Sequence, residues 1–382
     1  MSEHSGVETS INNLKSEHEE TRHAALLALA DAVKSTDYAA QETIVWAVGD
    51  YAARSKDQFA IQIMKDAIEH PNFRVRNIAV TALQWIDSEQ TATFLIQVLQ
   101  THPNSNARDT AAERLGTLID SRAVKPLAEA LFDPESHVQS SAHLGLKHLQ
   151  HGGYSMSDLV EYLIAKLNDS DPQIRQLAAR WLGSSQDERA LEPLVNSLLY
   201  DEMPAVRASA AMSIARLKDQ RAVDPLITAL TDSASSEIGK VCDHAAGALG
   251  EIRDTRAVEP LILALKNGCE GAAGGLGAIG DSRAVDPLIT AFRQGNFTAA
   301  FALATLNDST GIDALLDALQ SEHQEQYIAA YSALQRVTDP RVVEALEAFH
   351  KTKQFAEMDR LAADVMRQIA KIAADVGKNL NK

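Results

Sequence analysis

The stretch Asp219-Gln-Arg-Ala-Val-Asp-Pro-Leu226 decides the fold of this chain, because nearly the same phrase occurs four more times. We call it the Asp phrase. Copies that follow one another directly are separated by 27 residues (254 to 281) to 35 residues (219 to 254). The leading aspartates are Asp120, Asp187, Asp219, Asp254 and Asp281. Divergent copies of the phrase begin at Asp308 and Asp339. A period of this length is typical of repeat proteins, in which each repeat is one supersecondary unit.

Each Asp phrase predicts the start of a helix. The aspartate side chain can cap free backbone N–H groups, and the apolar residues that follow it recur at helical spacing, as Val223, Leu226 and Leu230 do. The proline falls in the first turn, where its missing N–H is tolerated. The phrase therefore marks one helix in every repeat.

A second helix is predicted before each phrase. It has the form Val-Arg-x-x-Ala-Ala-x-x-Leu, as in the residues from Val206 and the related residues from Ile174. The paired alanines allow helices to approach closely. A hairpin of two such helices cannot bury its apolar stripe alone, so neighbouring hairpins must stack.

This pattern resembles the HEAT superfamily, and in particular the subtype called phycobilisome-lyase HEAT-like repeats. The resemblance extends by repeat pattern from Asn72 to Phe349, and divergent second helices upstream place the start of the repeats near the N-terminus. It implies an all-α, right-handed α-α superhelix (a HEAT-like solenoid) of roughly ten helical hairpins. We expect the solenoid to occupy residues 1–352 and a C-terminal capping helix to occupy residues 353–382.

Composition limits the class of partner. The formal net charge is −16, and no run of Lys or Arg interrupts it, so a nucleic acid or an anionic membrane is not expected as a partner. The first 15 residues show no signal-peptide pattern, and no apolar run is long enough to span a membrane. With only two cysteines, the chain is expected to be cytoplasmic.

One repeat-equivalent position carries both cysteines. It lies 12 residues before each leading aspartate (for example 219 − 12 = 207). Its occupants include Arg108, Arg175, Arg207, Cys242 and Cys269. Arginine here could bond acceptors of the next repeat and link the stack.

The link should end at Cys242, and two readings of the cysteines are open. Cysteines in adjacent repeats should stand about 8–10 Å apart, too far for a disulfide unless the backbone moves. With Asp243 and His244 beside it, Cys242 could join Cys269 in a metal or thiol-adduct site. We favour small buried residues that fill a packing position, and so predict no metal.

Positions five and six residues after this slot are predicted to border the concave face. The side chains at these positions are large in the first repeats, very small in the middle ones and large again in the last. This order predicts a trough whose floor consists of glycine and alanine. The predicted partner-binding residues are Arg180, Trp181, Met212, His244, Gly247, Ala248, Gly274, Gly275, Phe297 and Phe301.

The glycines of this trough also have two readings. Glycine inside a helix costs about 0.5–1 kcal/mol relative to alanine. Gly274, Gly275 and their neighbours therefore either let backbones pack closely or expose backbone to a ligand. Close packing is the favoured reading.

Catalytic motifs fail when tested against their context. Gly268–Gly280 follows a helix, not a strand, and so does not form a phosphate loop. His18-Glu19 lacks the second histidine of a zinc-protease motif, and it is the single His-Glu pair, which excludes the di-iron hydroxylases of the HEAT class. The sequence predicts no catalytic residue and no cofactor.

Two functions remain. The first is a non-catalytic scaffold, adaptor or regulator that binds a partner protein on its concave face. The alternative, implied by the resemblance, is a bilin lyase subunit or a bilin-protein chaperone. A linear tetrapyrrole would then lie in the trough, with Cys242, Asp243 and Cys269 along its rim.

Overall fold

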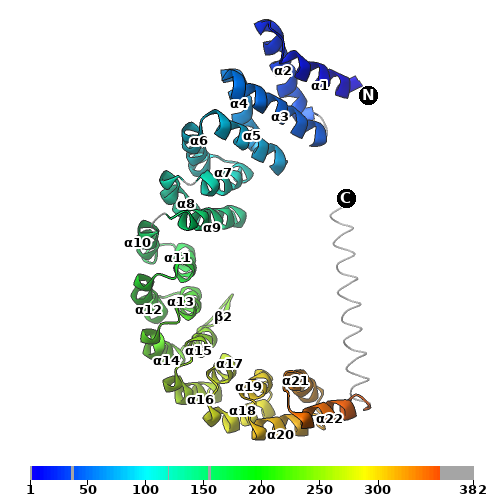
Figure 1. Cartoon of the computed structure of the whole chain (residues 1–382). Coiled ribbons are helices and arrows are strands. Elements are labelled where there is room, and N and C mark those ends of the chain that lie inside the picture. The colour runs from blue at the N-terminus through cyan, green and yellow to red at the C-terminus, as the bar shows by residue number, and fades with distance from the viewer. Residues whose placement is uncertain (1, 36–37, 119, 154–155, 353–382) are drawn as a thin grey trace. The chain divides into compact units, whose positions relative to one another are not determined.

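The computed structural model describes residues 2–35, 38–118, 120–153 and 156–352, and these are almost entirely helical (Figure 1). They form 22 α-helices, six short 3-10 helices and one two-stranded hairpin. The predicted all-α solenoid of stacked hairpins is confirmed. The expected capping helix at 353–382 lies outside the described residues.

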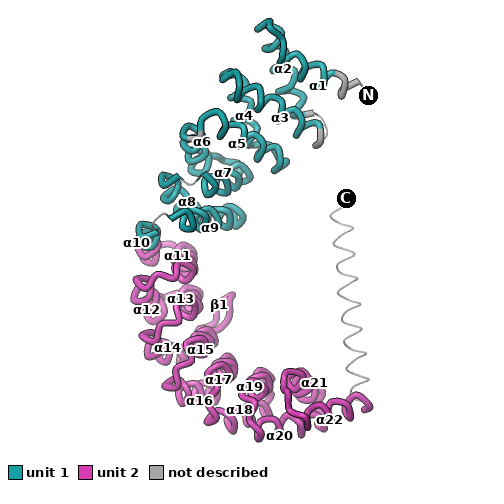
Figure 2. The backbone as a smooth tube through the Cα atoms, in the orientation of Figure 1, with its two compact units in different colours: residues 1–162 teal, residues 163–382 magenta. Residues whose placement is uncertain are grey.

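The chain divides into two compact units, Met1–Tyr162 and Leu163–Lys382 (Figure 2). Unit 1 contains nine complete helices and most of α10. Their bounds are α1 Ser2–Asn13, α2 Glu19–Ser35, α3 Tyr38–Ser55, α4 Gln58–Asp66, α5 Phe73–Ile86, α6 Ser88–Thr101, α7 Ser105–Leu118, α8 Val124–Ala130, α9 Ser136–His151 and α10 Ser157–Lys166.

Unit 2 continues the same alternation of helices. Their bounds are α11 Pro172–Ser185, α12 Leu191–Tyr200, α13 Pro204–Leu217, α14 Val223–Ala229, α15 Val241–Ile252, α16 Val258–Lys266, α17 Gly271–Ile279, α18 Val285–Arg293, α19 Thr298–Leu306, α20 Ser309–Ala318, α21 Gln324–Leu334 and α22 Pro340–Phe349. Strands β1 (Ser235–Ser236) and β2 (Gly239–Lys240) form an antiparallel hairpin between α14 and α15.

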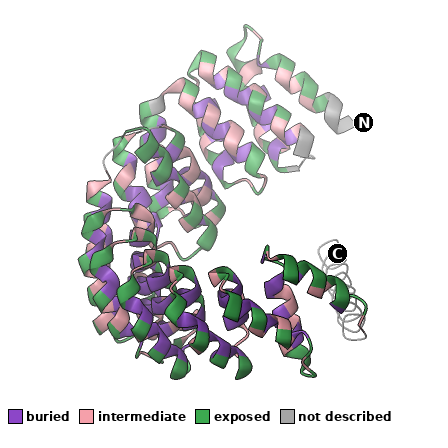
Figure 3. Cartoon of the chain, turned by 60° about the horizontal axis from the view of Figure 1, so that its bottom comes forward, coloured by how far each residue is buried: buried purple, intermediate pink, exposed green. Residues whose placement is uncertain are grey.

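The helices of unit 2 form two layers. Odd-numbered helices α11 to α21 pack successively on one another, and the even-numbered helices lie beside them as a second layer (Figure 1). Buried residues concentrate where helices face each other, and exposed residues cover the outer surfaces (Figure 3). Leu226, Leu261 and Leu288, which end successive Asp phrases, all lie in this core.

The aspartate of the Asp phrase caps the start of a helix, as predicted, and it also pairs with the arginine two residues later. Asp219 Oδ1 accepts the backbone N–H of Arg221 at 2.8 Å, a 3-10 turn follows, and α14 begins at Val223. The Arg221 side chain also returns to Asp219, with Nη2 2.6 Å from Oδ2. This hydrogen-bonded pair lowers the pKa of Asp219.

Odd helices approach each other through small residues. A Cβ atom on Gly116 would lie 2.3 Å from the Cα of Gly145, and one on Gly183 would lie 2.5 Å from the Cβ of Ser213. Such distances leave room for glycine only. In the part of the chain that the structure describes, no helix combines the length and the apolar character that crossing a membrane requires.

Candidate partner-binding face and cysteine cluster

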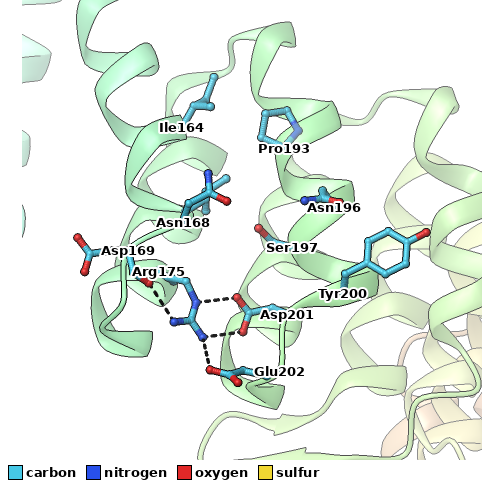
Figure 4. A pocket seen from close by; sticks show the side chains of 11 residues that line it. Ile164, Asn168, Asp169, Arg175, Pro193, Asn196, Ser197, Tyr200, Asp201 and Glu202 are labelled. Carbon is cyan, nitrogen blue, oxygen red and sulfur yellow. Dashed lines mark hydrogen bonds and ion pairs between the residues drawn. The ribbon is translucent and has the colours of Figure 1, made fainter.

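Arginine at the repeat-equivalent slot links adjacent repeats, as predicted. Arg175, at the start of α11, reaches Asp201 with Nε 2.8 Å from Oδ2 and Nη2 3.0 Å from Oδ1. Its Nη1 donates to the backbone carbonyl of Asp169, 3.0 Å away. One guanidinium thereby joins the loops that precede α11 and α13 (Figure 4).

The same link occurs in both units. Arg108 forms a two-pronged pair with Asp133 at 2.7 and 2.9 Å, and Arg207 forms one with Asp232 at 2.6 and 3.3 Å. In each case Nη1 also donates to the carbonyl six residues before the arginine. We call these contacts the Arg–Asp ladder; it joins Arg108 to Asp133, Arg175 to Asp201 and Arg207 to Asp232.

A pocket of about 580 Å³ lies beside the Arg175 link (Figure 4). Its walls include the side chains of Asn168, Asn196 and Tyr200, and Arg175 lies among the carboxylates of Asp201 and Glu202. The guanidinium is already paired with these carboxylates. The pocket therefore offers no free cation and contains no catalytic set that we recognise.

A second series of arginine contacts was not predicted. The arginine of one Asp phrase reaches the acidic residue at the sixth position of the phrase before it. Arg256 lies 3.4 Å from Asp224, and Arg283 lies 3.4 Å from Glu259. The acidic residue before the proline in four of the five clear phrases was the available signal in the sequence.

The fifth residue after the repeat-equivalent slot points toward solvent on the odd-numbered helices of unit 2. Arg180, Met212, Gly247 and Gly274 are exposed, and Phe301 is half-buried. A Cβ atom added at Gly247 or Gly274 would meet nothing within 4 Å. We call these five residues the odd-helix face of unit 2.

The sixth residue after the slot is buried in the two central repeats. The prediction that this position forms part of the floor of an open trough is therefore wrong. Ala248 and Gly275 are buried, and a Cβ atom on Gly275 would lie 2.5 Å from the carbonyl oxygen of Ala246. Consecutive residues of a helix point about 100° apart, so a position next to an exposed one can face the neighbouring helix. Ala248 and Gly275 serve close packing, and Gly274 remains on the surface.

The β-hairpin and His244 form a feature that the sequence did not reveal. Nε2 of His244 lies 2.7 Å from the carbonyl oxygen of Ile238, in the hairpin turn. Gln176 Nε2 on α11 donates to Glu237 Oε1 at 3.2 Å. His244 therefore holds the hairpin and does not join the cysteines. The extra length of the 35-residue repeat (219 to 254) was the signal.

The predicted aromatic residues lie near the ends of this face. Trp181 and Phe297 are half-buried. The guanidinium of Arg336, in the turn after α21, lies over the ring of Phe301, 5.0 Å from its centroid, which is a cation–π arrangement. Trp181 and Met212 therefore precede Gly247 and Gly274 in the series of odd helices, and Phe297 and Phe301 follow them.

The two cysteines meet more closely than the interhelix spacing suggested. The Sγ atoms of Cys242 and Cys269 and a carboxylate oxygen of Asp243 all lie within 4.8 Å of one another. Both side chains reach into the same space between α15 and α17. The thiols are free, and each cysteine is 3% exposed.

Asp243 organises this cluster. Its Oδ1 accepts the backbone N–H of Gly271 at 2.8 Å and lies 3.4 Å from Cys269 Sγ and 3.9 Å from Cys242 Sγ. Burial raises the pKa of both thiols, and the neighbouring Cys242 raises that of Cys269 further.

Unit 1 carries an exposed aromatic pair that the sequence reasoning missed. Trp46 on α3 and Trp85 on α5 are 45% and 57% exposed, with ring centroids 5.6 Å apart. Tryptophan is enriched at protein interfaces. Aligning the odd helices of unit 1 would have placed both residues on adjacent helices.

Comparison with known families agrees with the repeat pattern. Residues 26–108 and 160–243 match the model for HEAT repeats, and residues 241–267, 269–294 and 297–321 match the PBS lyase HEAT-like repeat. Together the matches cover more than half of the chain. No curated protein matches it.

Solved structures with a similar fold include Kap121p and importin beta. Kap121p has a TM-score of 0.55 at 12% identity over 87% of this chain and 45% of that one. Importin beta has a TM-score of 0.50 at 15% identity over 95% and 62%. A structure of Kap121p bound to the extreme C-terminus of the protein phosphatase Cdc14p has a TM-score of 0.53 at 14% identity over 97% and 46%. The chain spans about half the length of the Kap121p chains.

Proposed function

We propose that this chain, which belongs to the HEAT-repeat proteins and carries PBS lyase HEAT-like repeats, is a non-catalytic scaffold that binds a segment of another protein. The binding site is the odd-helix face of unit 2. The occupant is a helical or extended segment that lies across α13, α15 and α17.

The open space above Gly247 and Gly274 carries this proposal. Both residues are exposed helix glycines with nothing within 4 Å of a would-be Cβ, so packing within the chain does not require them. Each costs helix stability of about 0.5–1 kcal/mol relative to alanine. A partner segment that approaches the backbone closely would use the space that missing side chains leave.

The flanking side chains suit such a segment. Met212 precedes the glycines on α13, and Phe301 follows them on α19. Methionine adapts its shape to irregular surfaces, and aromatic rings contribute much of the energy at protein interfaces. The Kap121p structure with a bound Cdc14p terminus shows that a solenoid of similar fold can hold a terminal protein segment.

The bilin alternative has less support from the geometry. In this alternative Cys242 and Cys269 would line the rim of the trough, whereas each is 3% exposed and offers a ligand almost no surface. His244, which is next to Asp243 in the sequence, is bonded to the hairpin. We therefore keep the scaffold as the proposed function.

Site-specific photo-cross-linking tests the proposal. A photoreactive phenylalanine analogue replaces Gly247 or Gly274 in the full chain, and the variants are irradiated in an extract of the source organism. We expect one protein to be cross-linked at both positions, with the contact in a single segment of that protein by mass spectrometry. Trp181→Ala or Met212→Ala in the same chain should weaken its capture several-fold.

Two control positions locate the surface. Leu263 is exposed on α16, in the even layer of the same unit, and Trp85 is exposed in unit 1. The photoreactive residue at Leu263 should give no adduct with that protein. Capture of the partner through Trp85 alone, with none through Gly247 or Gly274, would place binding in unit 1 and overturn the proposal.

A further inference from the structure

We propose that Cys242, Asp243 and Cys269 form a zinc-binding site between α15 and α17. The three side chains come from two adjacent repeats and converge on one point, and among the described residues they are the one His/Cys/Asp/Glu group with ligand atoms so disposed. The proposal is independent of the scaffold function, because it concerns the space between two helices and not the odd-helix face.

The distances fit a tetrahedral metal. Zinc lies about 2.3 Å from a thiolate sulfur and about 2.1 Å from a carboxylate oxygen, which at a tetrahedral angle places sulfur about 3.6 Å from oxygen. The two Sγ to Oδ1 distances, 3.4 Å for Cys269 and 3.9 Å for Cys242, lie on either side of that value. Shifts of a few tenths of an ångström would give the liganded geometry.

The cluster lies at the N-termini of two helices. Cys242 is the second residue of α15, and Cys269 lies two residues before the start of α17. The N-terminus of a helix carries partial positive charge, which stabilises thiolate and carboxylate groups placed there. The N–H of Gly271 fixes the Asp243 carboxylate, in the manner of the outer hydrogen bonds that orient metal ligands.

The donor set determines which metal is expected. Two sulfur ligands and one oxygen select a borderline-soft ion such as zinc over calcium or magnesium, which take oxygen ligands. Asp243 is only half-buried, so solvent reaches one side of the cluster. The fourth position would be filled by water from that side.

The position of the cluster in the repeat series gives the metal a role. Arg175 and Arg207 link their repeats to the next through a paired aspartate, and Cys242 occupies the following slot, where this arginine is absent. A zinc ion held by Cys242 and Asp243 from α15 and by Cys269 before α17 would restore a link between those repeats. We infer that the ion replaces one rung of the Arg–Asp ladder.

Metal titration of the full chain tests this proposal. The protein is purified with a reductant and a chelator, the chelator is removed, and zinc is added while binding is followed by calorimetry and by mass spectrometry of the intact chain. We expect one zinc ion per chain and a rise in the melting temperature. Cobalt as a spectroscopic probe should give thiolate-to-metal charge-transfer absorption.

Matched variants distinguish this site from others. Cys242→Ser with Cys269→Ser should lose the cobalt–thiolate absorption and the zinc-induced rise in melting temperature, and Asp243→Asn should weaken binding at least ten-fold. His244→Ala, next to the cluster but bonded to Ile238, should bind zinc as the parent does. Absence of cobalt–thiolate absorption in the parent chain, or equal zinc binding by the double serine variant, would overturn the proposal.

Discussion

At the scale of single residues, two adjacent glycines have opposite environments. Gly274 is exposed with open space where a side chain would be, whereas Gly275 faces the backbone of α15. The sequence identified both as unusual but could not separate them, because a repeat alignment gives a position along a helix and not its rotation. A turn of about 100° decides whether a residue meets solvent or a neighbour.

This contrast predicts opposite effects of one substitution. Gly274→Ala should raise the free energy of unfolding by about 0.5–1 kcal/mol, because alanine favours the helix and meets no neighbour. Gly275→Ala should lower it, because the new Cβ would lie 2.5 Å from the oxygen of Ala246, which belongs to the backbone. Urea unfolding followed by circular dichroism measures both. A shift of the same sign in the two variants would contradict the assigned environments.

The capping aspartates make a second prediction at this scale, on pH dependence. The hydrogen bonds from Arg283 lower the pKa of Asp281 from 3.8 to about 2. A group with a lowered pKa in the folded state contributes stability above its unfolded pKa and loses it as pH falls through the folded value. The contribution of Asp281 is therefore complete above about pH 4 and is lost by about pH 2.

Asp281→Asn isolates that contribution. Asparagine caps a helix about as well as aspartate but carries no charge, so the cap remains and the titration disappears. We expect the melting temperature of the parent to fall more steeply than that of the variant between pH 4 and pH 2. Parallel curves in that window would show that the pair with Arg283 adds no stability.

At the scale of helices and hairpins, the sequence predicted where the helix of each Asp phrase begins. It did not predict which residues of the next repeat the arginines contact. The leading aspartate and the apolar spacing were sufficient for the helix start because capping is local. The partner of Arg175 lies 26 residues further along the chain, in the next repeat, and only the stacking register identifies it as Asp201. The β-hairpin was not predicted, because strands of two residues are too short to show an alternation of apolar and polar residues.

The ladder predicts a ranking among arginines on these elements. Arg175 and Asp201 are 9% and 7% exposed, so Arg175→Ala leaves a nearly buried carboxylate unpaired and should cost about 2–3 kcal/mol. Arg221, 62% exposed and paired with its own capping aspartate, should matter much less when changed to alanine. Urea unfolding of the two variants measures the difference. Equal losses would remove the ladder as a source of stability.

At the scale of the whole molecule, each unit is a series of repeats in which contacts join neighbours. Stability in such proteins is approximately a sum of repeat terms and nearest-neighbour terms. Within unit 2, the Arg–Asp ladder is one physical source of the nearest-neighbour term. Asp201 accepts Arg175 on its carboxylate and Arg207 on its carbonyl oxygen, the latter at 2.7 Å, so these arginines share one loop. Arg108 shares no partner with Arg207.

This arrangement predicts where double substitutions fail to add. Arg175→Ala and Arg207→Ala together should destabilise the chain by less than the sum of the single effects, with a shortfall of at least about 0.5 kcal/mol, because either change already loosens the loop at Asp201. Arg108→Ala with Arg207→Ala should add within about 0.5 kcal/mol, because their partners are separate. Urea unfolding of the singles and doubles completes both cycles. An additive first pair would mean that repeats of unit 2 are not coupled through the Asp201 loop, and a coupled second pair would require communication beyond nearest neighbours.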